Sequence, residues 1–311
     1  MAEGKRGVAI LGVFVADLAF RAGRMPGMGE TIAGSGFKLG PGGKGSNQAV
    51  AAARVGAEVT FITKIGKDEF GAIASATWRR EGVSAKVIES RDEPTGAAFI
   101  YVDDRSGENA IIVVPGAGGS IVPADVDAAR DVIRHSAVFI TQLEQPIDAA
   151  KRGLEIAREA GVTTIFNPAP AARFDDALYS LCDYLTPNEN EAGLLTGMTV
   201  ANLDDARKAG DAFLEKGVGT ALITLGEAGA LLHSRTQSTL IPAFKAGPVV
   251  ETTGAGDAFN GGLAAALARG SSASEAARFG CAVAGISVTR AGTAPSMPTL
   301  REVEALLVSD P

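Results

Sequence analysis

Asp257 follows a turn of small residues, Thr252-Thr253-Gly254-Ala255-Gly256, and precedes an Ala- and Leu-rich stretch that predicts a helix up to Arg269. Gly254 and Gly256 let a ligand approach the backbone closely, because they carry no Cβ. The free N–H groups and the dipole of the helix N-terminus favour an anion such as phosphate. A carboxylate beside a phosphate site can remove the proton from a substrate hydroxyl, as kinases require. The alternative for Asp257 alone is that it caps the helix.

A second glycine-rich segment, Gly40-Pro41-Gly42-Gly43-Lys44-Gly45, matches G-x-G-x-x-G and leads into a predicted helix. A dinucleotide fingerprint would follow the first strand directly, whereas this segment comes after an irregular stretch. It is not a Walker A loop, because Gly45 follows Lys44 where Ser or Thr is required. The segment predicts a backbone wall for a small polar ligand, with Lys44 and Asn47 as donors, or only a structural turn. A NAD-binding oxidoreductase built on this segment is an alternative function.

Polar residues also gather where predicted strands end. Asn188 and Glu191 open a helix and share one of its faces, and their oxygens suit Mg²⁺, although an acidic first turn is also common at helix N-termini. Ligands of open α/β sheets bind at the carboxyl ends of parallel strands. Such strand ends are also followed by two single carboxylates, Asp17 and Glu144, and by the segment Thr224-Leu225-Gly226-Glu227-Ala228-Gly229. Each of these is ambiguous alone, because many loop carboxylates are simply solvated.

The elements that position these residues alternate between strand and helix. Apolar runs predict strands at Val8–Val15, Glu58–Ile65, Ala137–Gln142, Val162–Phe166, Tyr184–Thr186 and Thr220–Thr224, and an antiparallel pair at Ala230–Ser234 and Leu240–Ile241. Helices are predicted at Ser46–Val55, Asp68–Glu81, Ile147–Ala160, Glu189–Leu195, Leu203–Lys216, after Asp257, at Ser274–Thr289 and at Leu300–Leu307. This order predicts parallel βαβ units with helices on both faces. Two β segments, about 18–40 and 96–114, interrupt it and should pack beside the main sheet.

Composition excludes several function classes. The 311 residues sum to 29 − 36 = −7 charges without a basic block, which argues against a nucleic-acid partner. Cys182 and Cys281 lack metal-type spacing, so a reduced, cytoplasmic protein is expected. Because the chain has only two histidines, His135 and His233, a metal site or catalytic triad built on histidine is disfavoured. No apolar run reaches the ~18 residues of a membrane span.

Four stretches, taken together and in this order, resemble the PfkB family of carbohydrate kinases, and within it the ribokinase branch. They are Gly42-Gly43-Lys44-Gly45-Ser46-Asn47-Gln48-Ala49, Asn167-Pro168-Ala169-Pro170-Ala171, Thr186-Pro187-Asn188-Glu189-Asn190-Glu191 and Thr252-Thr253-Gly254-Ala255-Gly256-Asp257. The likeness spans roughly residues 8–299. It implies a Rossmann-like, three-layer α/β/α fold with a mostly parallel sheet. It also implies that residues 1–311 form a single ribokinase-like kinase domain, with the two β segments as a small lid over the sugar.

The resemblance also implies roles for individual residues. Asp257 would be the base for the C5 hydroxyl of the sugar, with the Gly254-Ala255-Gly256 backbone holding the transferring phosphoryl group. The sugar-binding residues would be Asp17, Gly43, Lys44, Asn47, Glu144 and Asp257. The ATP site would contain Asn188, Thr224, Gly226, Gly229, Gly256 and Cys281. Glu191 would act on Mg²⁺ through water. A K⁺ site would be formed, mostly through backbone carbonyls, by Glu251, Thr253, Ser287, Arg290, Gly292 and Ser296.

Four positions depart from the family pattern. Val15 stands where ribokinases often carry Asn, and Pro41 replaces a common aromatic residue, and both changes bear on the sugar. Glu251 replaces the usual Asp of the cation site, which bears on K⁺ dependence. Cys281 stands where a His often flanks adenine.

The function expected from this resemblance is ATP-dependent phosphorylation of the 5-hydroxyl of D-ribose, with Mg²⁺ and K⁺. The resemblance further implies a cytoplasmic homodimer formed through the lid. The alternative within the family is a kinase for another sugar, such as deoxyribose or a ketohexose, or for a nucleoside. A sensor that kept the fold without catalysis is a third class, but it would have no use for the carboxylate of Asp257.

Overall fold

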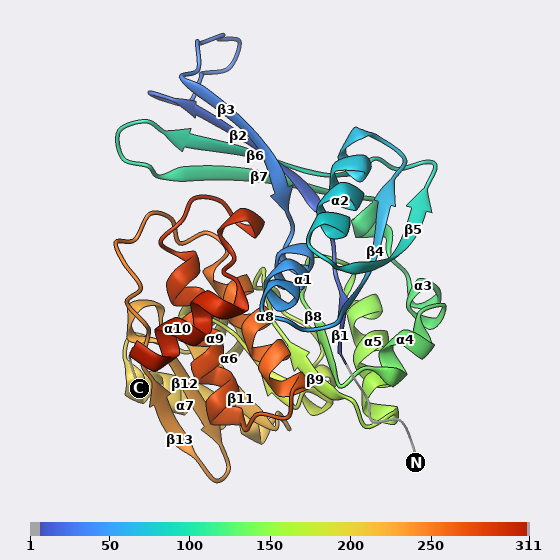
Figure 1. The fold of residues 1–311 in the computed structure, drawn as a ribbon, viewed down its shortest axis with the longest axis vertical. Coiled ribbons are helices and arrows are strands. Elements are labelled where there is room, and N and C mark those ends of the chain that lie inside the picture. The colour runs from blue at the N-terminus through green and yellow to red at the C-terminus, as the bar shows by residue number, and fades with distance from the viewer. Residues whose placement is uncertain (1–6, 310–311) are drawn as a thin grey trace.

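The computed structural model describes residues 7–309, which form a nine-stranded sheet, a separate four-stranded sheet and the helices around them (Figure 1). The large sheet has the strand order β13-β12-β11-β10-β9-β8-β1-β4-β5. Its strands are β1 (Val8–Leu11), β4 (Val59–Gly66), β5 (Ser84–Ser90), β8 (Val138–Thr141), β9 (Thr163–Phe166), β10 (Tyr184–Leu185), β11 (Thr220–Thr224), β12 (Ala230–Ser234) and β13 (Ser238–Ile241). Only the β11–β12 and β12–β13 pairs are antiparallel. The mostly parallel sheet predicted from the sequence is confirmed.

Helices cover both faces of this sheet, because its strands are apolar on both sides. In β1, Val8 and Ile10 join one hydrophobic cluster, while Ala9 and Leu11 join the other. The first cluster receives α1 (Lys44–Arg54), α2 (Glu69–Arg80), α8 (Ala255–Ala268), α9 (Ala273–Ser287) and α10 (Leu300–Ser309). The second receives α3 (Pro123–Asp127), α4 (Arg130–His135), α5 (Ile147–Glu159), α6 (Glu189–Thr196) and α7 (Leu203–Glu215). Short 3₁₀ turns are η1 (Ala117–Ser120), η2 (Asp176–Leu181), η3 (Gly226–Ala228) and η4 (Ala294–Ser296).

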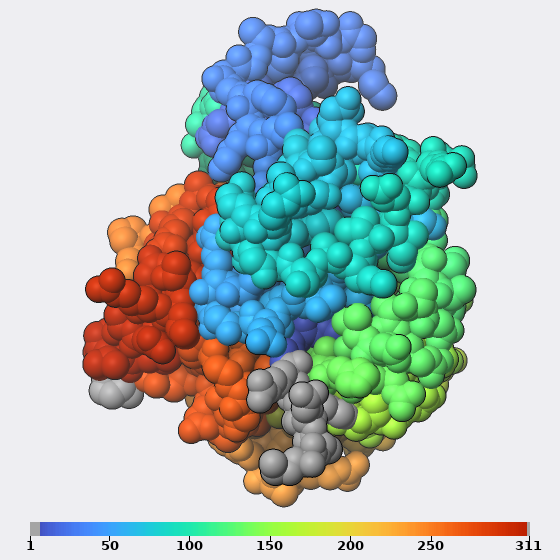
Figure 2. Space-filling view, turned by 45° about the vertical axis from the view of Figure 1, so that its right-hand side comes forward, coloured from blue at the N-terminus to red at the C-terminus, as the bar shows by residue number. Residues whose placement is uncertain are grey.

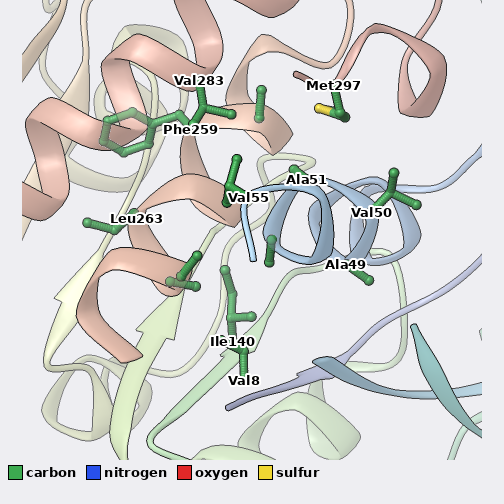
Figure 3. Close-up of a cluster of buried hydrophobic side chains, with 14 of the residues drawn as sticks. Val8, Ala49, Val50, Ala51, Val55, Ile140, Phe259, Leu263, Val283 and Met297 are labelled. Atoms are coloured by element: carbon green, nitrogen blue, oxygen red, sulfur yellow. The ribbon is translucent and has the colours of Figure 1, made fainter. Parts of the chain in front are cut away.

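Helices α1 and α8 pack unusually closely. A Cβ added at Gly261 of α8 would lie 2.5 Å from the Cβ of Ala51 and 2.7 Å from the Gln48 carbonyl oxygen of α1. Figure 3 shows the surrounding cluster, which includes Val55, the residue after α1, and Leu263 of α8. Since both helices begin at glycine-rich turns, this contact brings the two predicted ligand-binding turns together.

The small sheet has the order β3-β2-β6-β7 and stands apart from the large one (Figures 1 and 2). Its strands are β2 (Val15–Ala22), β3 (Gly36–Gly42), β6 (Thr95–Asp103) and β7 (Asn109–Gly116). The two interrupting β segments predicted at about 18–40 and 96–114 are therefore confirmed, and they pair with each other through parallel strands β2 and β6.

Some predicted boundaries are wrong. The first strand ends at Leu11 rather than Val15, because the chain leaves the large sheet at Gly12 and Val15 already pairs within the small sheet. Strand β5 was not predicted, since most of its residues are polar and partly or fully exposed at the sheet edge. The short helices α3 and α4 were also missed, because each is too brief to show a helical period.

The strand order reverses between β1 and β8. From β1 the chain continues to β4 on one side, whereas from β8 it continues to β9 on the other. In parallel α/β sheets, the carboxyl ends of strands at such a reversal form a crevice that binds ligands. Gly12 after β1 and Gln142 after β8 meet there, since a Cβ at Gly12 would lie 2.5 Å from Gln142 Oε1.

None of the helices in the described part of the chain is long and apolar enough to cross a membrane.

Candidate active site

Gly254 is the residue immediately before helix α8, and its φ of 84° is a left-handed conformation that glycine adopts without strain. The Ala255 N–H donates to the Thr252 carbonyl at 3.1 Å, so the amides of Gly256 and Asp257 are the ones left for an anion. A Cβ at Gly256 would meet nothing within 4 Å, so this residue faces open space. The first turn of α8 is therefore an accessible site for an anion.

The carboxylate of Asp257 does not cap its own helix. It is 6% exposed and turns toward α1, where Asn47 Nδ2 donates to Oδ2 at 3.0 Å and Gln48 Nε2 donates to Oδ1 at 3.1 Å. Burial raises the pKa of Asp257, while the positive charge of Lys44 and the two amide donors oppose that rise. The helix-capping alternative is wrong, because the buried carboxylate accepts its hydrogen bonds from α1 and not from the N-terminus of α8.

Further charged groups converge on Asp257. Glu144 accepts a hydrogen bond from the Lys44 N–H at 2.7 Å. Burial, with repulsion from Asp257 and Asp17, raises the pKa of Glu144 to about 7, against the attraction of Lys44. Burial and the charges of Asp257 and Glu251 raise the pKa of Asp17 to about 7 as well. Burial opposes the charge of Lys44, but Asp257, Glu144 and Glu191 hold its pKa above the ordinary value.

A cavity of about 520 Å³ lies beneath the small sheet, and we call it the small-sheet cavity. Its lining includes Asp17, Lys38, Pro41, Glu251, Thr253 and Gly292. The chain that follows Pro41 packs closely, because a Cβ at Gly42 would lie 2.3 Å from the Asp17 carboxylate and one at Gly43 would lie 2.6 Å from the Val13 carbonyl. Val15 lies in a hydrophobic cluster and is 3% exposed.

A second cavity, of about 420 Å³, lies between α8, α9 and the ends of β10 and β11, and we call it the C-terminal cavity. It brings together every residue predicted for the ATP site: Asn188, Thr224, Gly226, Gly229, Gly256 and Cys281. Phe244, Phe259 and Val288 give it apolar walls, which suits a flat base. Burial raises the pKa of the Cys281 thiol to about 12, so it lines the cavity as a neutral group.

Asn188 and Glu191 form a capping box at the start of α6. The Glu191 N–H donates to Asn188 Oδ1 at 2.8 Å, and the Asn188 N–H donates to Glu191 Oε2 at 2.9 Å. The two residues thus shape the helix terminus, as the alternative interpretation predicted. Burial raises the pKa of Glu191, against the hydrogen bond from Asn188 and the charge of Lys44, and Asp257 repels it. The carboxylates of Glu191 and Asp257 therefore both interact with the positive charge of Lys44.

The residues predicted for K⁺ are only partly free to bind it. Glu251 accepts a hydrogen bond from the Gly292 N–H at 2.8 Å, and both line the small-sheet cavity with Thr253. The side chains of the other three make local contacts, Ser287 with the Ala284 carbonyl, Ser296 with the Thr293 carbonyl and Arg290 with Glu302. Those three would contribute backbone oxygens only. No cluster of three or more His, Cys, Asp or Glu side chains suited to a metal occurs among residues 7–309.

The segment 249–256 separates the two cavities. Glu251 and Thr253 line the small-sheet cavity, whereas Thr252, Ala255 and Gly256 line the C-terminal one. The N-terminus of α8 therefore lies where a group could pass from a ligand in one cavity to a ligand in the other.

A family model described as pfkB family carbohydrate kinase matches residues 5–300. This chain belongs to the pfkB family. It is a phosphotransferase with an alcohol group as acceptor, and the oxidoreductase alternative is wrong.

Relatives of this pfkB kinase include enzymes for two pentoses. The ribokinase of Haemophilus influenzae is 40% identical over 299 residues, covering 96% of this chain and 97% of the relative. The deoxyribokinase of Salmonella typhi is 34% identical over 302 residues, covering 96% and 98%. The solved structure of Arabidopsis thaliana ribokinase complexed with ribose and ATP has a TM-score of 0.92 at 30% identity, covering 97% of this chain and 98% of that one.

Three polar residues buried near Asp257 in this pfkB kinase were not predicted from the sequence. Gln48, Asn167 and Asn260 are buried around Asp257, and none was assigned a role. Gln48 lies in the first of the four motifs and Asn167 in the second, whereas Asp257 lies in the fourth. Their proximity depends on the close contact of α1 with α8, which the sequence pattern does not reveal.

Proposed function

We propose that this kinase transfers the γ-phosphoryl group of ATP to the 5-hydroxyl of D-ribose, giving ribose 5-phosphate and ADP. The observation that carries the proposal is the position of the α8 N-terminus, whose first turn contains Asp257, between two cavities. The ribokinase relatives and the likeness to a ribokinase bound to ribose and ATP support ribose as the acceptor. We assign the sugar to the small-sheet side and ATP to the C-terminal cavity.

The sugar would be held by a set of acceptors and donors near Asp257. The Asn47 side chain is 3% exposed, and its Oδ1 has no hydrogen-bond partner within the described structure, while its Nδ2 is bonded to Asp257. Because a buried unpaired acceptor is costly, a sugar hydroxyl that donates to it would be favoured. Asp17 and Glu144 provide further acceptors, and Lys44 provides a donor.

The reaction moves one proton and one phosphoryl group. Asp257 takes the proton of the 5-hydroxyl, and the sugar oxygen forms a bond to the γ-phosphorus as the bond to the β,γ-bridging oxygen breaks. The amides of Gly256 and Asp257 stabilise the charge on the transferring group, aided by the dipole of α8. ADP leaves with the electron pair of the broken bond.

Glu191 suits Mg²⁺, because it is a buried carboxylate and Mg²⁺ often combines one carboxylate with water and substrate phosphates. The bound ion would neutralise phosphate charge. We assign K⁺ to Glu251 and to backbone oxygens of Thr253, Ser287, Arg290, Gly292 and Ser296. The Glu251 carboxylate, already bonded to the Gly292 N–H, would orient that loop.

Deoxyribose is the strongest alternative acceptor, since a deoxyribokinase is also a relative. Of the two departures that bear on the sugar, only Pro41 lines the small-sheet cavity. We further propose that the small sheet is the lid of a single catalytic domain, that two chains pair through it, and that the enzyme is cytoplasmic.

The test is ADP release from ATP and Mg²⁺ with ribose, deoxyribose, fructose, tagatose or adenosine, with and without K⁺. We expect ribose to give the highest kcat/KM and K⁺ to increase it. Higher kcat/KM for another acceptor would contradict ribose, and equal rates without K⁺ would contradict the cation site. In the same assay, Asp257→Asn should lower kcat at least ~10²-fold while ATP still binds.

A further inference from the structure

A buried chain of side-chain amides leads from the large sheet to Asp257. Gln142, at the end of β8, donates through Nε2 to Gln48 Oε1 at 2.6 Å. Gln48 Nε2 donates in turn to Asp257 Oδ1 at 3.1 Å and to Asn167 Oδ1 at 3.1 Å. Gln48 and Gln142 are both 0% exposed, and Asn167 is 6% exposed. These bonds connect the base to two strand ends of the large sheet.

The chain continues from Asn167 back to helix α8. Asn167 Nδ2 donates to the Thr186 carbonyl at 2.9 Å, and Thr186 Oγ1 donates to Asn260 Oδ1 at 2.7 Å. Asn260 Nδ2 then donates to the Gly256 carbonyl at 2.9 Å. The same network therefore holds both the carboxylate of Asp257 and the turn that would bind phosphate.

The network permits one orientation of the Gln48 amide. Because its oxygen accepts from Gln142, its NH₂ group faces Asp257 and Asn167. A flipped amide would place the oxygen against two other oxygens and lose all three hydrogen bonds. The Gln48 backbone is also fixed, since its carbonyl lies against Gly261 of α8. The residue thus has one position and one polarity.

We propose that Gln48 is a positioning residue for phosphoryl transfer, holding the Asp257 carboxylate in an ionised and fixed orientation. The inference rests on the proposed role of Asp257 as the base. A neutral donor to a buried carboxylate favours its charged form, which is the form that accepts the substrate proton. The charged groups that act on Asp257 are Lys44 of α1, Glu144 after β8, Glu191 of α6 and Asp17 of β2.

The test compares pH profiles of kcat for the wild type, Gln48→Met and Gln48→Glu. Methionine keeps the volume but removes the donor, so the midpoint of the rising limb should move to higher pH and kcat at neutral pH should fall about tenfold or more. Glutamate keeps the shape and adds a like charge beside Asp257, so its midpoint should move further upward. If Gln48→Met does not fold, the pH profile of Gln48→Glu still tests the positioning role.

Gln145→Met is the matched control. Gln145 is 3% exposed and donates to Thr141 Oγ1 at 2.8 Å and to the Gln142 carbonyl at 2.6 Å, without contacting Asp257. We expect its midpoint to equal that of the wild type. An unmoved midpoint in both Gln48 variants, or an equal shift in the control, would overturn the positioning role. If Asp257→Asn kept full kcat, the proposed base itself would be wrong, which is a separate result.

Discussion

At the scale of single residues, the site accumulates carboxylates that resist ionisation. Burial raises the pKa of Glu144 to about 7 from an ordinary 4.5, so the folded protein holds this proton more tightly than the unfolded chain. The free energy of unfolding therefore falls as pH rises from about 4.5 to about 7, and the full penalty persists above that range.

Glu144→Gln should remove this penalty. Without ligand, we expect the variant to exceed the wild type in unfolding free energy by on the order of 1–3 kcal/mol at pH 8, and by little at pH 4.5. Urea unfolding at both pH values measures the difference. The exposed Glu215→Gln serves as control, with no pH-dependent gain. A gain for Glu144→Gln of the same size at pH 4.5 would contradict an ionisation effect.

The residue types in the motifs were enough to identify Asp257 as a candidate site residue. They did not predict which side chains surround its carboxylate. The sequence left open whether Asp257 caps its helix, and only the packing of α1 on α8 shows that its partners are Asn47 and Gln48. Gln142 was visible only as the end of a strand. Contacts such as these join residues about a hundred or more positions apart, which local spacing does not encode.

At the scale of elements, turn chemistry was easier to predict than short or exposed elements. The glycine turn before α8 and the hairpin of β6 and β7 have strong local patterns, whereas the segment of β2 and β3 looks irregular in sequence. Strand β5 has few buried side chains to mark it, and its place is fixed by parallel pairing with β4. The residues of β5 alone therefore do not predict this edge strand, because its pairing partner β4 lies elsewhere in the sequence.

The N-terminus of α8 permits a test at this scale. Gly254 has φ 84° and a new Cβ would lie 3.3 Å from Thr293 Cα, whereas Gly270, after the same helix, has φ 86° and open space around it. Alanine at either position should cost about 1–2 kcal/mol of unfolding free energy. Only Gly254→Ala should also lower kcat, about tenfold or more, because it displaces the turn that we propose binds phosphate. Equal kcat values in the two variants would argue against that turn's role.

At the scale of the whole molecule, the small sheet has two different faces. One face, including Asp17, Ala19, Lys38 and Ile100, lines the small-sheet cavity. On the other face, the row of paired residues Leu39, Leu18, Phe99 and Ile112 continues across all four strands. Phe20 packs on Phe37 and Phe99 on this outer face. This outer face is apolar and exposed, with Phe37 59% and Ile112 62% exposed, which fits the proposed pairing of two chains through the small sheet.

The proposed dimer through this outer face can be tested by charge. A lysine at Ile112 would place an ammonium group in an apolar interface, so Ile112→Lys should sediment as a single 31.6 kDa chain while the wild type sediments as a pair. Val308→Lys is the control, because Val308 is 82% exposed on α10, outside the small sheet, and should leave the pair intact. A wild-type protein that sediments as one chain would exclude the dimer, and an Ile112→Lys variant that remains paired would place the interface on another surface. Since the opposite face of the same strands covers the sugar side, loss of pairing should also raise the KM for sugar more than the KM for ATP.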